Sequence, residues 1–151
     1  MQKLAILVTR LSSWVLSKMG RGGSMPGRLG IKIAPDCLNH LKFGGPVILV
    51  TGTNGKTSTA NMVSDLMEEA GYKVVTNRKG DNLRFGITST LLSHCSLSGR
   101  VKADAAVLEV DELNMKYIVP ALPVTAIVVN NFFRDQLDRA GEMERIIDTI
   151  E

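Results

Sequence analysis

The sequence predicts an α/β fold built on a mostly parallel sheet with flanking helices. From Val47 onward, short apolar runs rich in β-branched residues alternate with segments that have helical periodicity. The runs are mostly apolar and do not alternate with polar residues, as expected for parallel strands that are buried on both faces. The predicted strands span residues 47–51, 73–76, 105–110 and 125–129, and the predicted helices span 57–70, 86–93 and 112–119, with a last one beginning near Gly141.

A short basic helix is expected before the sheet, in the segment QKLAILVTRLSSWVLSKM. Its apolar residues recur with helical spacing on one face, at Leu4, Leu7, Val8, Leu11 and Val15. We expect this helix to pack on the following domain. Two other interpretations stay open: an organellar transit peptide, because the segment contains Arg and Ser but no acid, and a helix lying on a membrane surface with Trp14 at the interface. Its apolar run is shorter than the about 20 residues that a spanning helix needs.

A glycine-rich segment follows, GRGGSMPGRLG at residues 20–30. Its five glycines and one proline are typical of a loop, and we expect a flexible linker here. Residues 1–46 contain seven Lys or Arg and one Asp, a net charge of +6, whereas the remainder carries −3. This segment is therefore expected to meet something anionic, such as a phosphate, a diphosphate or an acidic membrane surface. The expected division is residues 1–46, the helix and basic loop, and residues 47–151, the sheet domain.

The helix expected at residues 57–70 has a regular apolar stripe, and Gly71 gives its C-terminal end. We expect the stripe to be buried against the sheet: Met62, Val63, Leu66, Met67 and Ala70.

Composition excludes some functions. Aromatic residues make up 5% of the chain and do not interleave with the basic ones, so no base-stacking surface for nucleic acid is indicated. Cys37 and Cys95 lie far apart without a secretory signal, which indicates reduced thiols in a cytoplasmic protein. Their neighbours His40 and His94 do not complete the usual zinc spacing.

The stretch VTGTNGKTST, residues 50–59, lies between a predicted strand and a predicted helix. Such a loop directs backbone N–H groups and the positive end of the helix dipole at phosphate, so we expect a P-loop-type fold that binds ATP. Lys56 can reach the β- and γ-phosphates, and the Thr57 hydroxyl can hold magnesium. The standard spacing GxxxxGK[ST] would place glycine at position 50, where Val50 stands. The expected nucleotide-binding residues are Gly52, Thr53, Asn54, Gly55, Lys56, Thr57 and Ser58.

A second magnesium ligand is expected on a neighbouring strand, because a threonine alone leaves the ion short of ligands. AAVLEVDE provides Glu109 near the strand end, followed by Asp111 and Glu112. We expect Glu112 to face solvent. For Asp111 both positions stay open, facing solvent or facing the site. The polar residues after the second strand are candidate substrate contacts, because ligands of open α/β sheets bind at the carboxyl ends of strands: Asn77, Arg78, Asp81 and Asn82.

GTNGKTS, from Gly52, resembles the shortened phosphate loop of the Mur ligase superfamily, which joins a carboxylate to an amine at the expense of ATP. The resemblance implies a magnesium-binding role for Glu109 and, with Lys56, a catalytic one. VVNNFFRDQLDRAGE resembles the family pattern N-x-x-x-D-H-L-D, with Asn131 and Asp135 as further candidate substrate contacts. Gln136 replaces the family's histidine; its carbonyl could coordinate magnesium, although it cannot act as a nitrogen ligand.

FFRDQLDR, TNRKGDNLRFGI and RGGSMPGR resemble the MurT branch of this family, the ligase subunits of lipid II isoglutaminyl synthase. The resemblance implies ATP-dependent amidation of the D-glutamate α-carboxylate of lipid II to D-isoglutamine through an acyl phosphate, at the inner face of the cell membrane. Ammonia would come from a GatD-type glutamine amidotransferase. It also implies that residues 47–151 are an incomplete Mur ligase central domain, and that the chain is an N-terminal fragment, inactive alone.

Two other functions stay open. One is an amino-acid-adding Mur ligase or a folylpolyglutamate-synthase-like enzyme, although Gln136 counts against it. The other is a catalytically inactive nucleotide-binding fragment.

Overall fold

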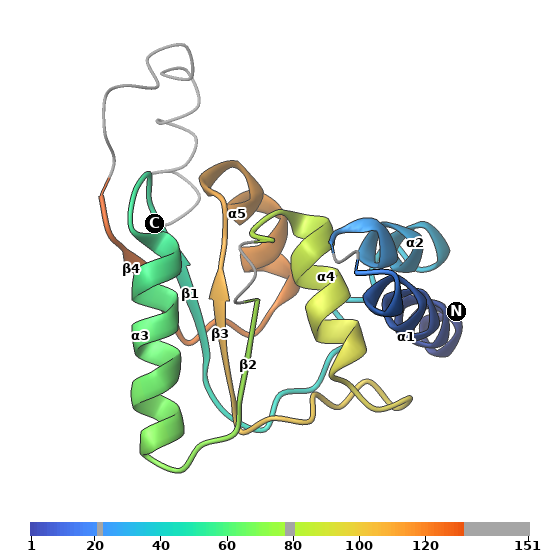
Figure 1. Ribbon diagram of the computed structural model, residues 1–151, viewed down its shortest axis with the longest axis horizontal. Helices are drawn as coiled ribbons and strands as arrows, with labels where there is room; N and C mark the ends of the chain where they lie inside the picture. Colours follow the sequence, from blue (N-terminus) through green and yellow to red (C-terminus); the bar gives the residue numbers. More distant parts are fainter. Residues whose placement is uncertain (21–22, 78–80, 132–151) are drawn as a thin grey trace.

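The computed structural model describes residues 1–20, 23–77 and 81–131. It confirms the α/β fold, with four parallel strands in the order β2-β3-β1-β4 (Figure 1). The strands are β1 (Val47–Thr51), β2 (Val74–Thr76), β3 (Ala105–Glu109) and β4 (Ala126–Val129). Every residue of β3 is buried, whereas Ala126 and Val129 of the edge strand β4 are exposed. The expected helix near Gly141 lies outside the described residues.

Helices cover both faces of the sheet. On one face α3 (Lys56–Glu69) packs with Ala60 against Val50 and Val107. On the other face a larger core contains Leu49 and Leu108 together with residues of α4 (Arg84–Ser93) and α5 (Met115–Ile118). The single helix expected at residues 112–119 is instead divided into a 3-10 turn η1 (Glu112–Asn114), the short α5, and a second 3-10 turn η2 (Val119–Ala121). Pro120 cannot donate an N–H to a continuing helix, and η2 ends one residue after it.

The face that α3 buries matches the predicted stripe only in part: Val63 and Met67 pack against the core as predicted, whereas other residues of the stripe do not. Met62 and Leu66 are 62% and 61% exposed, whereas Ala60 and Ser64 are buried and Val63 is partly buried. The hydroxyl of Ser64 donates to the carbonyl oxygen of Ala60 at 2.7 Å, so this buried polar group is satisfied within the helix. The phosphate loop fixes where the helix starts and so how it is rotated, and hydropathy alone does not show that rotation.

The prediction of a loop at residues 20–30 is wrong for its second half, because α2 (Met25–Ile33) is a helix. Pro26 stands in its first turn, where a missing N–H costs nothing. A Cβ on Gly27 would lie 1.8 Å from the carbonyl oxygen of Phe85 in α4, and a Cβ on Gly30 would lie 2.5 Å from Thr9 Oγ1. These glycines therefore allow close helix packing and do not mark a linker.

The first helix, α1 (Gln2–Lys18), packs against α2 and α4, as expected, but through another face than the predicted one. Ala5, Ile6 and Thr9 are buried, and Thr9 Oγ1 donates to the carbonyl oxygen of Pro26 at 3.2 Å. Most of the predicted apolar stripe remains exposed. The helix itself lies at the outer edge of the molecule (Figure 1). Within the described ranges, none of the helices combines the length and hydrophobicity that crossing a membrane requires.

Candidate functional site

The candidate site lies at the carboxyl ends of β1 and β3, the two central strands. In the parallel register Val50 of β1 pairs with Glu109 of β3. The chain leaves β1 toward α3 on one face of the sheet and leaves β3 toward η1 and α5 on the other. Diverging connections of this kind open a crevice at the strand ends, which is where open α/β sheets bind ligands.

The loop between β1 and α3 has a backbone that only glycine adopts readily. Gly52 has φ 130° and Gly55 has φ 80°. A Cβ on Gly52 would also lie 2.9 Å from the carbonyl oxygen of Asn131, so the position is sterically closed to a side chain. The first turn of α3 follows directly, and its N–H groups have no partner within the helix. This arrangement fits a phosphate group.

Thr57 and Glu109 meet beside this loop. The Thr57 hydroxyl donates to Glu109 Oε2 at 2.8 Å, and the Asn82 side-chain amide donates to Oε1 at 3.0 Å. Glu109 is 4% exposed, yet both its carboxylate oxygens have partners. A hydroxyl and a carboxylate oxygen placed together next to a phosphate cradle are the ligand types that magnesium prefers. The residues present therefore fit a magnesium ion that is shared with phosphates.

Lys56 extends across the mouth of the loop. Its ammonium group donates to the carbonyl oxygens of Gly52 and Thr53, and it forms an ion pair of 3.5 Å with Glu112. The side chains of Lys56 and Glu112 are only 13% and 15% exposed. The expectation that Glu112 faces solvent is thus wrong: η1 turns directly after β3 and directs this carboxylate to Lys56. Asp111 instead caps η1, accepting from the backbone N–H of Leu113 at 3.1 Å.

Two asparagines after β4 hold the phosphate loop in place. The side chain of Asn131 accepts from the backbone N–H of Asn54 at 3.0 Å and donates to its carbonyl oxygen at 3.1 Å. The Asn130 side chain donates to Thr59 Oγ1 at 2.9 Å. Asn131 was predicted as a substrate contact, and the structure places it against the loop. The role of Asn130 was missed, although the pair of asparagines at a strand end was a visible signal.

Asn77 joins the end of β2 to β3. Its amide donates to the carbonyl oxygen of Glu109 at 2.8 Å and accepts from the Glu109 N–H at 2.9 Å, so it extends the sheet pairing by one side chain. It also donates to the carbonyl oxygen of Asp81 at 3.1 Å. Burial raises the pKa of the Asp81 carboxyl. Together with Asn82, these residues surround Glu109 from the β2 side.

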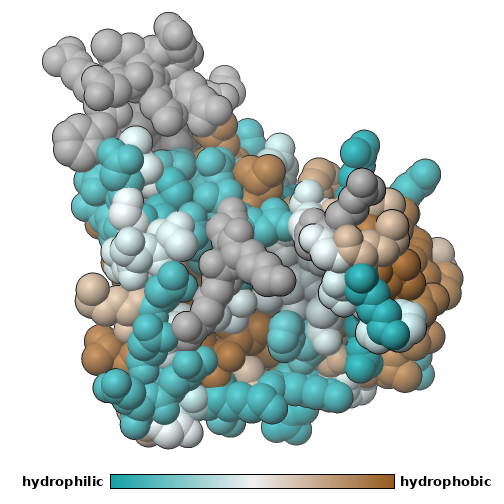
Figure 2. Space-filling view, in the orientation of Figure 1, coloured by the Kyte–Doolittle hydropathy of each residue, from teal (hydrophilic) through white to brown (hydrophobic). Residues whose placement is uncertain are grey.

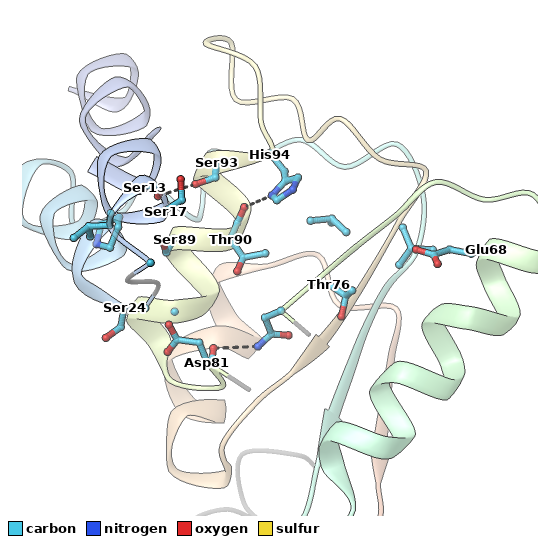
Figure 3. Close-up of a pocket in the computed structure, with 18 residues that line it drawn as sticks. Ser13, Ser17, Ser24, Glu68, Thr76, Asp81, Ser89, Thr90, Ser93 and His94 are labelled. Atoms are coloured by element: carbon cyan, nitrogen blue, oxygen red, sulfur yellow. Dashed lines mark hydrogen bonds between the residues drawn. The ribbon is translucent and has the colours of Figure 1, made fainter. Parts of the chain in front are cut away.

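A cavity of about 890 Å³ adjoins this cluster (Figure 3). Asn77 and Asp81 are among its lining residues, and α1, α4 and β2 form much of its wall. Much of the lining is hydroxyl-bearing: Ser13, Ser17, Ser24, Thr76, Ser89, Thr90 and Ser93. Such a surface offers many neutral donors and acceptors, and it suits a ligand with amide or hydroxyl groups.

Ser58, the last of the predicted nucleotide-binding residues, is exposed in the first turn of α3. Three other predicted site residues, Arg78, Asp135 and Gln136, lie outside the described residues. Among the residues with described positions, His, Cys, Asp and Glu side chains nowhere form a group of three or more that could hold a metal ion. Cys37 and Cys95 are free and buried.

Comparison with known proteins gives consistent relatives. The MurT subunit of lipid II isoglutaminyl synthase (glutamine-hydrolyzing) from Streptococcus pneumoniae is 37% identical over 140 residues, covering 93% of this chain and 31% of that protein. The same subunit from Staphylococcus aureus (strain COL) is 30% identical over 151 residues, covering 99% and 34%. A UDP-N-acetylmuramoylalanine–D-glutamate ligase from Buchnera aphidicola is 34% identical over 115 residues, covering 76% and 23%. The chain thus spans about a third of the length of these MurT relatives.

A family model described as the Mur ligase middle domain matches residues 50–150, most of the chain. The match begins at the end of β1 and includes the phosphate loop, the Thr57–Glu109 pair and the asparagines after β4. The chain belongs to the Mur ligase family.

Proposed function

We propose that this chain provides the ATP-binding part of a ligase that amidates the D-glutamate α-carboxylate of lipid II to D-isoglutamine. The hydrogen bond between Thr57 and Glu109 carries the proposal. It brings a hydroxyl and a carboxylate oxygen, two kinds of magnesium ligand, together beside the loop proposed to bind the triphosphate. The likeness to two proteins named as MurT subunits supports the choice of reaction.

In this proposal, the loop residues Gly52 to Ser58 bind the phosphates of ATP through backbone N–H groups and the Lys56 ammonium. Thr57 and Glu109 would hold magnesium, with Gln136 as a further proposed ligand. The bound ion would neutralise phosphate charge. Lys56 is already held over the loop by two carbonyl oxygens and by Glu112, so a phosphate would exchange with these acceptors.

The reaction follows from the weak reactivity of a carboxylate toward nucleophiles. An oxygen of the D-glutamate α-carboxylate attacks the γ-phosphorus of ATP, ADP leaves, and an acyl phosphate forms. Ammonia then attacks the acyl carbon and the new C–N bond forms. The bond from the acyl carbon to the phosphate oxygen breaks, and phosphate leaves with the proton that the nitrogen gives up. The chain's own contribution is to position the reactants and to place the positive charge of Lys56 at the transferred phosphoryl group. This is the catalytic role proposed for Lys56, and that of Glu109 is to hold the magnesium ion.

The acceptor peptide is proposed to occupy the cavity next to Asn77. Asn77 and Asp81 line it, and Asn77 bonds directly to the backbone of Glu109. A substrate in the cavity could therefore present a carboxylate at the phosphate loop. Asn82, Arg78, Asn131 and Asp135 complete the proposed substrate contacts, with Asn131 acting through the loop that it holds.

Ammonia would come from a GatD-type glutamine amidotransferase, since the MurT relatives are named as subunits of a glutamine-hydrolyzing synthase. Work on lipid II would place the complex in the cytoplasm at the inner face of the cell membrane. We propose a helical N-terminal part at residues 1–46 and the ATP-binding part at residues 47–151. Because the chain spans about a third of its MurT relatives, the whole reaction is expected to need further segments of the enzyme.

A second candidate is an amino-acid-adding ligase, which the likeness to the D-glutamate ligase from Buchnera aphidicola favours. The two functions differ in the amine that attacks the acyl phosphate. A catalytically inactive nucleotide-binding chain would show neither activity.

The test is an amidation assay on protein expressed from its complete natural reading frame, with its glutaminase partner, lipid II, ATP and magnesium. We expect lipid II to be converted to the D-isoglutamine form, detected by mass spectrometry, with glutamine or ammonium as nitrogen source. Lys56→Ala should abolish the conversion, while Lys73→Ala, remote from the loop, should not. Incorporation of an amino acid instead of ammonia would favour the second candidate, and no turnover with a folded protein would contradict both.

A further inference from the structure

We propose that α1 is a membrane-surface docking element, with its exposed apolar face at the interface of an anionic bilayer. This α1 apolar face consists of large side chains on successive turns of one side of the helix. They are Leu4 (51% exposed), Leu7 (50%), Leu11 (65%), Trp14 (56%) and Val15 (42%). Figure 2 shows hydrophobic surface at the edge of the molecule where α1 lies in Figure 1.

Packing fixes the direction of this face. The opposite side of α1 carries Ala5, Ile6 and Thr9, all fully buried, and Ser13, which accepts a hydrogen bond of 3.1 Å from Ser93 of α4. A close approach at Gly30 of α2 leaves no room for the helix to roll, because even a Cβ there would meet Thr9 Oγ1 at 2.5 Å. The large apolar side chains therefore cannot turn into this core without breaking the packing of three helices.

The charges around the face identify its partner. Lys3, Arg10 and Lys18 of α1 are all exposed, and residues 1–35 contain no acidic residue. Lys18 Nζ lies 4.4 Å from the centroid of the Trp14 ring, so a cation and an amphipathic ring share one end of the helix. Apolar residues on one face with cations beside them are the features of helices that lie in the interface of anionic membranes.

A second copy of this chain fits the same face less well. Two α1 helices packed on each other through this face would bring their lysines and arginines together without acidic partners, and like charges there oppose association. Anionic lipid headgroups instead neutralise these cations while the leucines and Trp14 enter the acyl boundary. Charge complementarity thus favours a lipid surface.

The docking surface also adjoins the cavity described above. Ser13 and Ser17 of α1 line that cavity, so one side of the helix faces the lipid and another borders the proposed substrate site (Figure 3). Docking would hold the wall that α1 gives the cavity close to the headgroups. This consequence rests on the proposed function, whereas docking itself does not.

The experiment is co-flotation of the protein, expressed from its complete natural reading frame, with vesicles of phosphatidylglycerol and phosphatidylcholine that contain no lipid II. We expect flotation with the anionic mixture and little with phosphatidylcholine alone or at high salt. The double substitution Leu7→Glu and Leu11→Glu should reduce vesicle partitioning at least about tenfold, since it removes two apolar anchors and adds two negative charges. Met62→Glu with Leu66→Glu, at the exposed positions of α3, makes the same charge change and should leave flotation unaltered.

Trp14, the chain's only tryptophan in these 151 residues, reports on the contact itself. Subtracting the fluorescence spectrum of Trp14→Phe from that of the wild-type protein gives the emission of Trp14. This emission should shift to shorter wavelength with anionic vesicles and be quenched by brominated lipid. Equal flotation of the α1 and α3 double variants, or no shift of Trp14 on vesicles, would overturn the proposal. So would self-association that the α1 substitutions abolish without any vesicle binding, because that result assigns the face to a second copy. Since the vesicles lack lipid II and ATP, this outcome is separate from the amidation assay.

Discussion

The Thr57 hydroxyl donates a 2.8 Å hydrogen bond to Glu109 Oε2 and so joins the first turn of α3 to the end of β3. The residues are 52 positions apart in sequence, and the parallel pairing of Val50 with Glu109 brings them together. Because Thr57 follows Lys56 directly, the same helical turn offers a cation for phosphate and a ligand for magnesium.

Glu109→Gln should weaken the magnesium-dependent part of ATP binding. The amide keeps the side chain's shape but removes the negative charge, so we expect a loss of roughly 10- to 100-fold, corresponding to about 1.5–3 kcal/mol for a hydrogen-bonded charge. Isothermal titration with ATP in magnesium and in EDTA measures this. Glu69→Gln at the exposed end of α3 is the control, and an equal effect of both substitutions would refute the assignment.

Asn131→Ala should loosen the phosphate loop. The substitution removes both hydrogen bonds to the backbone of Asn54, each worth about 0.5–1.5 kcal/mol. We expect faster hydrogen exchange of the amides at residues 52–55 and ATP affinity reduced about tenfold, as the loop must then be ordered on binding. Asn39→Ala, at an exposed position far from the loop, should change neither quantity; unchanged exchange in the Asn131 variant would argue against a positioning role.

Gly27→Ala should destabilise the packing of α2 on α4. The added methyl group would overlap the carbonyl oxygen of Phe85, which is backbone and cannot rotate away. We expect a loss of about 1–3 kcal/mol or more in the free energy of unfolding, measured by urea denaturation. Gly30→Ala should cost less, because the nearest atoms belong to the side chains of Thr9 and Leu92. Arg28→Ala, on the exposed side of the same helix, should be close to neutral.

The two thiols should be unreactive in the folded protein. Burial raises the pKa of Cys37 to about 11 and also raises the pKa of Cys95, so both remain protonated at pH 8. Alkylation with iodoacetamide at pH 8 should therefore be slow in buffer and fast in denaturant, where the pKa values return toward about 8.5. Mass spectrometry of tryptic peptides measures the alkylation of each cysteine. Rapid modification of either one in buffer would show that its thiol is accessible to solvent.

The strands were predictable because their signal is local. Each strand is built on a short apolar run, such as residues 105–108, which is bounded by Asp104 and Glu109. The phosphate loop was also predictable, since its two glycines, Lys56 and Thr57 all lie within residues 52–57. In both cases a short segment determines its own conformation.

The features that the sequence does not reveal depend on contacts between segments that are distant along the chain. Gly27 and Pro26 indicate a loop by composition, but Gly27 serves the approach of α2 to α4, which is visible only in three dimensions. The apolar stripe of α1 predicted the wrong buried face, and that of α3 was right only for Val63 and Met67. The packing of small residues such as Ala5 and Ala60 decides how each helix is rotated. Glu112 was assigned to solvent because its partner Lys56 is 56 positions away.

The central claim is that the loop around Lys56 binds ATP with magnesium, and titration of ATP into the wild-type protein and Lys56→Ala tests it most directly. We expect saturable, magnesium-dependent binding by the wild type and an affinity more than about tenfold lower in the variant, with the unfolding transition of both proteins similar. Lys73→Ala should bind like the wild type. Equal ATP affinity in the wild type and the Lys56 variant, or no binding by a folded wild-type protein, would contradict the account.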